Sequence, residues 1–128
     1  MGYPDDLKYS KEHEWVRLDG ERAVVGITDH AQSELGDVVY VELPEVGKVF
    51  ERDGALAVVE SVKAVSDVYA PFSGKVLEVN EKLNDAPETI NESPHDEGWI
   101  AVVEVSDASE LEDLMDAAAY EAFIGTLS

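Results

Sequence analysis

The fold is decided by the stretch Val58-Val59-Glu60-Ser61-Val62-Lys63-Ala64-Val65-Ser66-Asp67-Val68-Tyr69, which has a single lysine at its centre. β-Branched and aromatic residues lie on both sides of Lys63, and such residues favour strands. We therefore predict a β-hairpin with strands over residues 55–62 and 64–69 and with Lys63 at or near the turn. A lysine at that position projects into water, and its amine suits the attachment of a long prosthetic arm.

Short strands are predicted along most of the remaining chain. The pair Asp19-Gly20 is a hairpin signal between two alternating segments. Further alternating runs stop at Pro44, at Asp53-Gly54 and after Ala70-Pro71. The strands expected outside the lysine hairpin cover residues 13–18, 22–27, 38–43, 48–51, 74–79 and 99–105. This pattern predicts a mostly β fold.

Two short helices are predicted between the strands. Asp29 is placed to cap a helix through Glu34, which Gly36 ends. Pro87 suits the first turn of a small helix that runs to about Asn91. These segments are too short to form a helical layer of their own, so they are expected to cover parts of the sheets.

The C-terminal segment changes to helical character. Ser109-Glu110-Leu111-Glu112 has the pattern of a capping box. Apolar residues then recur at helical spacing, and a second apolar set is expected on a separate short helix that begins near Asp116. The chain of 128 residues is predicted to be a single domain over residues 1–128, with a core over about 20–105 and a helical segment over about 107–125.

The net charge of −20, from 29 acidic and 9 basic residues, limits the classes of partner. Nucleic acids and anionic membranes need clustered Lys and Arg, so neither is expected as a partner. A strongly acidic surface favours solubility and attracts basic or ammonium-bearing molecules. Adaptation to high salt is a second explanation for the acidity.

The side chains that usually support thiol or metal chemistry are scarce. Cysteine is absent, which excludes disulfides, thiol catalysis and cysteine-ligated zinc. His13, His30 and His95 lack the spacing of metal ligands. The first residues are polar and acidic, unlike a signal peptide or a basic transit peptide. The expected compartment is the cytoplasm, with the mitochondrial matrix as the alternative for a processed organellar protein.

A weak internal repeat lies on either side of the lysine. Gly47-Lys48-Val49-Phe50-Glu51 matches Gly74-Lys75-Val76-Leu77-Glu78 at four of five positions. The repeat is compatible with two related halves of a small sandwich or flattened barrel, with Lys63 between them.

The lysine segment resembles the attachment site of lipoyl domains. Glu60 lies three residues before the lysine and Gly74 eleven after it, as in that superfamily. Biotin carriers share the fold but usually flank their lysine with methionine, whereas Val62 and Ala64 stand here. The resemblance implies a mostly β barrel-sandwich hybrid of the lipoyl/biotinyl type with short helices. It also implies lipoate on Lys63, with Glu60 and Gly74 as recognition residues around it.

The rest of the chain is similar to the glycine cleavage H-protein family. Isolated lipoyl domains of the 2-oxoacid dehydrogenases lack both the segment near Trp15 and the C-terminal helices. The matching motifs cover nearly the whole chain: Tyr9, His13-Glu14-Trp15, Val25-Gly26-Ile27-Thr28, Leu35-Gly36-Asp37-Val38-Val39, Val41-Glu42-Leu43-Pro44, Ile90-Asn91, Pro94, Gly98-Trp99 and residues 111–123.

The family resemblance implies a carrier that is not itself an enzyme. Its lipoyl arm would take the aminomethyl group of glycine from glycine decarboxylase to aminomethyltransferase, and the reduced arm to dihydrolipoamide dehydrogenase. A lipoate ligase or a lipoyl/octanoyl transferase would attach the arm. A covalent tether keeps the reacting group at a high effective concentration near each enzyme.

The same resemblance implies acidic neighbours for the ammonium of the loaded arm. Glu14 and Asp67 match positions near the docked arm in the family. Glu12 is a further candidate, although some members carry a small hydroxyl residue there. Each of these acids is alternatively an ordinary surface charge.

Three other interpretations of the whole chain stay open at this stage. An H-type lipoyl-relay protein would pass lipoyl groups from Lys63 to other complexes. An unmodified acidic interaction domain would use the lysine only as a solvated charge. An enzyme is the third possibility, but the sequence gives no nucleophile–base pair, phosphate loop or metal cluster.

Overall fold

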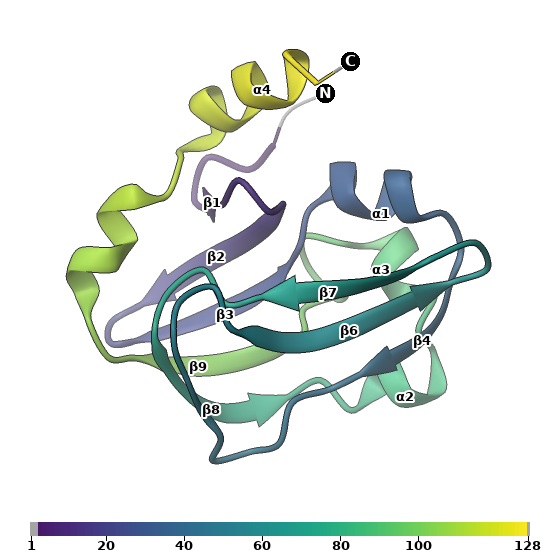
Figure 1. Ribbon diagram of the computed structural model, residues 1–128, viewed down its shortest axis with the longest axis horizontal. Helices are drawn as coiled ribbons and strands as arrows, with labels where there is room; N and C mark the ends of the chain where they lie inside the picture. The colour runs from purple at the N-terminus through teal and green to yellow at the C-terminus, as the bar shows by residue number, and fades with distance from the viewer. Residues whose placement is uncertain (1–2, 128) are drawn as a thin grey trace.

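The computed structural model describes residues 3–127 and shows two antiparallel sheets with short helices around them (Figure 1). Within these residues the larger sheet has the strand order β1-β2-β3-β9-β8-β5, and the smaller sheet has the order β4-β6-β7. The strands are β1 Lys8–Tyr9, β2 Glu14–Asp19, β3 Arg22–Ile27, β4 Val38–Glu42, β5 Val49–Phe50, β6 Ala55–Ser61, β7 Val65–Tyr69, β8 Gly74–Val79 and β9 Ala101–Val105. The predicted mostly β fold is confirmed. Every predicted strand is present within two residues of its expected ends, whereas the two-residue β1 was not predicted.

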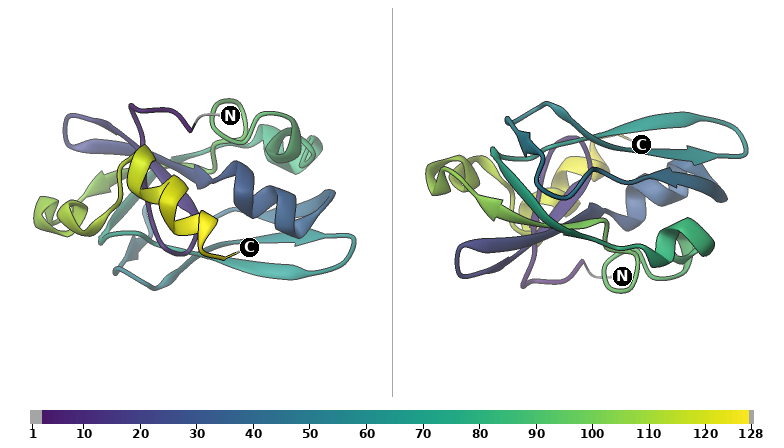
Figure 2. Two further views of the ribbon diagram at one scale, coloured as in Figure 1. Left: turned by 90° about the horizontal axis from the view of Figure 1, so that it is seen from above. Right: turned by 90° about the horizontal axis from the view of Figure 1, so that it is seen from below.

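The main core lies between the two sheets. Val25, Val76 and Val103 of the larger sheet and Val41 and Val59 of the smaller sheet are buried in one apolar cluster. Period-two alternation places these side chains on the inner faces of their strands. The two layers are visible from above and below in Figure 2, where the β6–β7 hairpin runs along one side of the molecule. Burial of the inner faces therefore fixes the register in which the hairpin is presented.

The two copies of the internal repeat are neighbours in the larger sheet. Val49 of β5 pairs with Lys75 of β8, and Phe50 pairs with Gly74. The hairpin that carries Lys63 lies between these two strands in chain order.

The predicted helix after β3 is α1 Asp29–Leu35, which ends at Gly36. The prediction that Asp29 caps it is wrong, because Thr28 is the N-cap. Thr28 has extended backbone, and its hydroxyl accepts a hydrogen bond from the N–H of Ala31. Thr28 has the capping side chain one residue earlier, so Asp29 falls inside the first turn.

Two single-turn helices follow β8. The predicted helix near residues 87–91 is α3 Thr89–Glu92, which starts two residues later than expected. The helix α2 Lys82–Asp85 was not predicted. It is a single turn without a side-chain cap, and it is held by the burial of Leu83.

The C-terminal segment forms two helices of different kinds. The predicted capping box is wrong: residues Ala108–Asp113 form the 3₁₀ helix η1, and Asp107 accepts the hydrogen bond from the N–H of Ser109. The predicted second helix is α4 Ala117–Gly125, which Asp116 caps. No helix among residues 3–127 is both long and apolar enough to span a membrane.

Tyr120 attaches α4 to the rest of the molecule. Its ring stacks on Tyr9 with centroids 4.8 Å apart. Its hydroxyl lies 2.7 Å from the hydroxyl of Thr28 and 2.7 Å from Nδ1 of His13. The tyrosine therefore connects α4 to the start of α1 and to the segment before β2.

Candidate functional site

Lys63 lies in the turn between β6 and β7 and is exposed. The N–H of Ser61 donates to the carbonyl of Ala64 at 2.8 Å, and the hydroxyl of Ser61 accepts from the N–H of Ala64 at 3.1 Å. The N–H of Val62 donates to the carbonyl of Asp37 at 3.1 Å, which attaches the turn to the start of β4. The lysine is therefore presented on a fixed backbone, and the prediction of a hairpin turn at this position is confirmed.

The Lys63 side chain lies against Gly36, which ends α1. A Cβ added at Gly36 would be 3.5 Å from Cε of Lys63, and Gly36 itself has a φ of 85°. Glycine adopts this left-handed conformation without strain. Among residues 3–127, the Lys63 amine has neither a hydrogen bond nor an ion pair. Its amine is thus available for covalent modification.

A groove lies beside the hairpin, between β2, α1 and β7. It encloses a cavity of about 180 Å³. Apolar side chains form much of its wall and acidic side chains stand among them. The lining residues are Glu12, His13, Glu14, Ile27, Ala31, Glu34, Leu35, Val59, Ser66, Asp67 and Val68. A cavity below the roughly 300–1,000 Å³ of drug-sized pockets suits a narrow chain better than a bulky ring system.

Glu14 is the buried acid of this groove, with 1% of its surface exposed. One carboxylate oxygen accepts a hydrogen bond from the hydroxyl of Ser10, and the other accepts from the N–H of Tyr69 at 3.2 Å. Burial raises the pKa of Glu14 to about 7, although both hydrogen bonds act in the opposite direction. None of the residues that line the groove is Lys or Arg. The site is therefore poised to gain stability from an incoming cation.

The structure brings together all three acids that the sequence put forward. Glu14 stands in the wall, whereas Glu12 and Asp67 are exposed residues that also line the groove. Glu34 and His13 line the same groove but were not among the predicted site residues. The spacing of Ala31, Glu34 and Leu35 on one helical face is the signal that could have indicated α1 as a wall of the groove.

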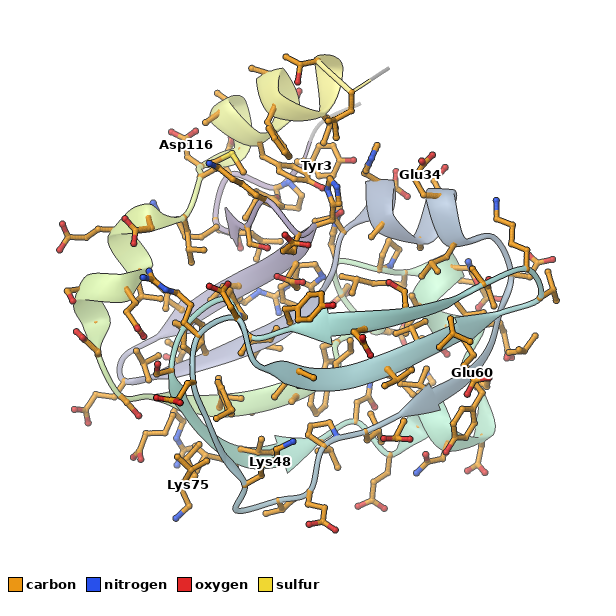
Figure 3. The ribbon with its side chains drawn as sticks, viewed as in Figure 1. Tyr3, Glu34, Lys48, Glu60, Lys75 and Asp116 are labelled. Atoms are coloured by element: carbon orange, nitrogen blue, oxygen red, sulfur yellow. The ribbon has the colours of Figure 1, made fainter. Side chains whose placement is uncertain are left out.

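The two recognition residues lie in different environments. Glu60 pairs with Val65 on the hairpin and is half-buried. Figure 3 shows Glu60 below the β6–β7 hairpin and Glu34 on α1 above it. Gly74 is buried in β8, where an added Cβ would be 2.2 Å from the carbonyl oxygen of Glu104. Only Glu60 is therefore accessible to a partner, and the need for glycine at position 74 is steric.

A model of the family described as glycine cleavage H-protein matches residues 7–126. The chain belongs to the glycine cleavage H-protein family. A relative named glycine cleavage system H protein, from Anaeromyxobacter sp. strain K, is 60% identical over 124 residues, which are 97% of each chain. The protein of the same name from Bacillus subtilis strain 168 is 60% identical over 121 residues, covering 94% of this chain and 95% of the relative.

A solved structure supports the same family assignment. The crystal structure of a glycine cleavage system H protein from Mycobacterium marinum superposes with a TM-score of 0.88 at 37% identity. The match covers 96% of this chain and 99% of the other chain. The predicted barrel-sandwich fold with short helices is confirmed for this member of the H-protein family.

Replacement of Glu14 by glutamine is expected to stabilise this H-protein family member above neutral pH. Between the ordinary pKa of 4.5 and about 7, the folded state keeps a proton that the unfolded state has lost. Stability of the wild type should therefore fall as pH rises through this window, by up to about 3 kcal/mol. Glutamine has the same shape and never ionises: its oxygen can still accept from the N–H of Tyr69, and its NH2 group would donate to the hydroxyl of Ser10.

Urea denaturation from pH 5 to pH 8 would test this expectation. The Glu14→Gln protein should unfold at higher urea than the wild type at pH 8, and the difference should shrink toward pH 5, where Glu14 is protonated. Parallel stability curves for the two proteins would show that burial of the Glu14 charge has no energetic cost.

Proposed function

We propose that the chain is the lipoyl-bearing carrier of a glycine cleavage system. The exposed and unpaired amine of Lys63, held on a fixed turn beside an apolar and acidic groove, is the observation that supports this role. Lipoate would be joined to Lys63 through an amide. The carrier would have no catalytic activity of its own, because the reactive sulfur belongs to the arm and the reactions belong to the partner enzymes.

The groove residues fit a lipoyl arm. Such an arm is a long apolar chain, and Ile27, Leu35 and Val68 offer it apolar contacts. Residues 66–68 lie about 10–17 Å along β7 from Lys63 by the rise of a strand. A bare lysine side chain does not reach that far, whereas a lysine lengthened by an octanoyl-derived arm does. The groove is therefore placed where the end of the arm would arrive.

The acids of the groove fit the cargo of the arm. When bound, lipoate supplies a sulfur that carries the aminomethyl group, and this group ends in an ammonium. Glu14 in the wall and Asp67 at the hairpin would accept hydrogen bonds from it, with Glu12 as a further acid nearby. An ammonium beside Glu14 favours the ionised carboxylate, so binding would release the proton that burial holds there.

The proposed partners follow from this cycle. Glycine decarboxylase would load the arm, aminomethyltransferase would unload it, and dihydrolipoamide dehydrogenase would reoxidise it. A lipoate ligase or a lipoyl/octanoyl transferase would first modify Lys63. The two relatives named above come from bacteria, which supports the cytoplasm as the compartment in which these encounters occur.

Intact-mass analysis of the protein from its native source tests the proposal. In cells grown on glycine we expect the mass of an amide-linked lipoyl group, with peptide mapping that places it on Lys63. An unmodified chain under these conditions would contradict the carrier role and favour the acidic interaction domain. Transfer of the group from Lys63 to other complexes, without glycine cleavage, would instead favour lipoyl relay.

A further inference from the structure

Exposed apolar side chains gather near the proposed attachment lysine. Val62 in the turn is 71% exposed, Val65 at the start of β7 is 67% exposed, and Tyr40 on β4 is 49% exposed. A single exposed valine is ordinary on a protein surface, but here several exposed apolar side chains stand close to one functional lysine. A grouping of this kind on one surface is typical of an interaction site.

The register of the smaller sheet places Tyr40 and Val65 in one row, with Glu60 between them. Tyr40 of β4 pairs with Glu60 of β6, and Glu60 pairs with Val65 of β7. Directly paired residues point to the same face of a sheet. The adjacent row of Val41, Val59 and Ser66 points toward the core and the groove. The row Tyr40–Glu60–Val65 therefore lies on the outer face, away from the groove.

The charges of this outer face have one sign. Glu60 and Glu42 lie on this face, Glu42 two residues after Tyr40 along β4, whereas Asp67 lines the groove. None of the strands β4, β6 and β7 contains Lys or Arg. Asp37 lies just before β4, beside the turn. Lys63 is thus the only cation along the hairpin, and it stands at the edge of an acidic surface with an apolar row across it. The complementary surface would be apolar at its centre and basic around it.

The row Tyr40–Glu60–Val65 lies close enough to Lys63 to be covered by any protein that binds over the Lys63 amine. A standard interface covers about 800 Å² on each partner, which is a disc of about 16 Å radius. Strands in a sheet lie about 4.8 Å apart, so the row across three strands spans about 10 Å. Its centre, Glu60, is three residues from Lys63. An enzyme with its active site over Nζ would cover the whole row.

The opposite side of the hairpin is less suited to that enzyme. It holds the groove, whose lining includes Glu12, Glu34 and Asp67. Under the proposed carrier function, this groove receives the arm once it is attached. Contact on the outer face leaves the groove open.

We propose that the row Tyr40–Glu60–Val65, together with Val62, is the docking surface for the acyl-transferring enzyme that loads Lys63, and that this enzyme meets it with an apolar patch flanked by Lys and Arg. The inference rests on the proposed carrier function. Tyr40 and Val65 supply the apolar contact, as aromatic and aliphatic anchors do in other interfaces. Glu60, which the family resemblance already implies as a recognition residue, supplies the charge at the centre, and the new part of the surface is Tyr40, Val65 and Val62.

Loading of the unmodified full chain by a lipoate–protein ligase, with lipoate and ATP, tests the surface. Tyr40→Ser and Val65→Ser should each lower kcat/KM about 5- to 30-fold, mainly through KM, which is the range for loss of one anchor. Val49→Ser is the matched control, because Val49 is also 71% exposed but lies on β5 of the other sheet. Equal loading of the Tyr40, Val65 and Val49 variants would overturn the proposal.

Charge variants test the chemistry of the partner separately. Val65→Lys should be loaded more slowly than Val65→Asp, and Glu60→Gln should flatten the dependence of kcat/KM on salt. The reverse order of the Val65 variants would contradict a basic partner. Failure of the carrier function itself gives a different result, since the wild-type chain would then not be modified at Lys63 at all.

Discussion

Replacement of Lys63 by arginine is expected to abolish lipoylation and all glycine cleavage activity while the fold is retained. The guanidinium keeps the positive charge but does not form the amide that a lysine amine forms with lipoate. The side chain is exposed and has no hydrogen bond or ion pair within residues 3–127, so its loss should leave the unfolding temperature within about 2 °C of the wild type.

The measurement combines intact mass, glycine-dependent release of carbon dioxide in the reconstituted system, and thermal unfolding. Lys75→Arg is the matched control, because Lys75 is also exposed but lies far from the hairpin turn (Figure 3). It should be lipoylated and active like the wild type. Glycine cleavage that persists in the Lys63→Arg protein would refute the assignment of the arm to this lysine.

Replacement of Gly74 by alanine is expected to have the largest effect on stability. The new Cβ would be 2.2 Å from the carbonyl oxygen of Glu104 and 3.2 Å from the ring of Phe50. The first contact is with backbone, so it cannot be relieved by a side-chain rotation, and β8 would have to move away from β9. Overpacking of this kind costs about 3 kcal/mol, or about 10 °C in the unfolding temperature.

Gly125→Ala is the control for this substitution. Gly125 lies in α4, and an added Cβ there has no atom within 4 Å. Because alanine favours helix over glycine, this variant should be as stable as the wild type or more stable by up to about 1 kcal/mol. If Gly74→Ala unfolded at the same temperature as Gly125→Ala, the close approach of β8 and β9 would not limit residue size at position 74.

The alternation of apolar and polar residues, together with the β-branched residues, was sufficient to predict most of the strands and the lysine hairpin. The runs around Lys63 combine β-branched residues with period-two burial, and no helical pattern competes with them. Helix ends were harder to predict. Thr28 and Asp29 both have capping side chains, and in the structure it is the hydroxyl of Thr28 that accepts from the N–H of Ala31 while it also contacts the hydroxyl of Tyr120.

The candidate site was only partly visible in the sequence. The resemblance of the Glu60, Lys63 and Gly74 spacing to lipoyl domains is what allowed the attachment lysine to be predicted. The groove could not be predicted as a whole, because Glu34 and His13 reach it through the packing of α1 and through the contact of His13 with Tyr120. Contacts of this kind depend on tertiary structure and leave no periodic pattern in the sequence.

The sequence by itself determined the strands, the exposed turn lysine and the acidic character of the surface, since each depends on neighbouring residues or on composition. Tertiary structure alone decided that Glu14 and Asp67 face one groove, and that Glu14 is buried there with a raised pKa. It also decided that Tyr40 and Val65 share one face with Glu60. The physical reason is that burial and strand register bring together residues that the chain keeps far apart.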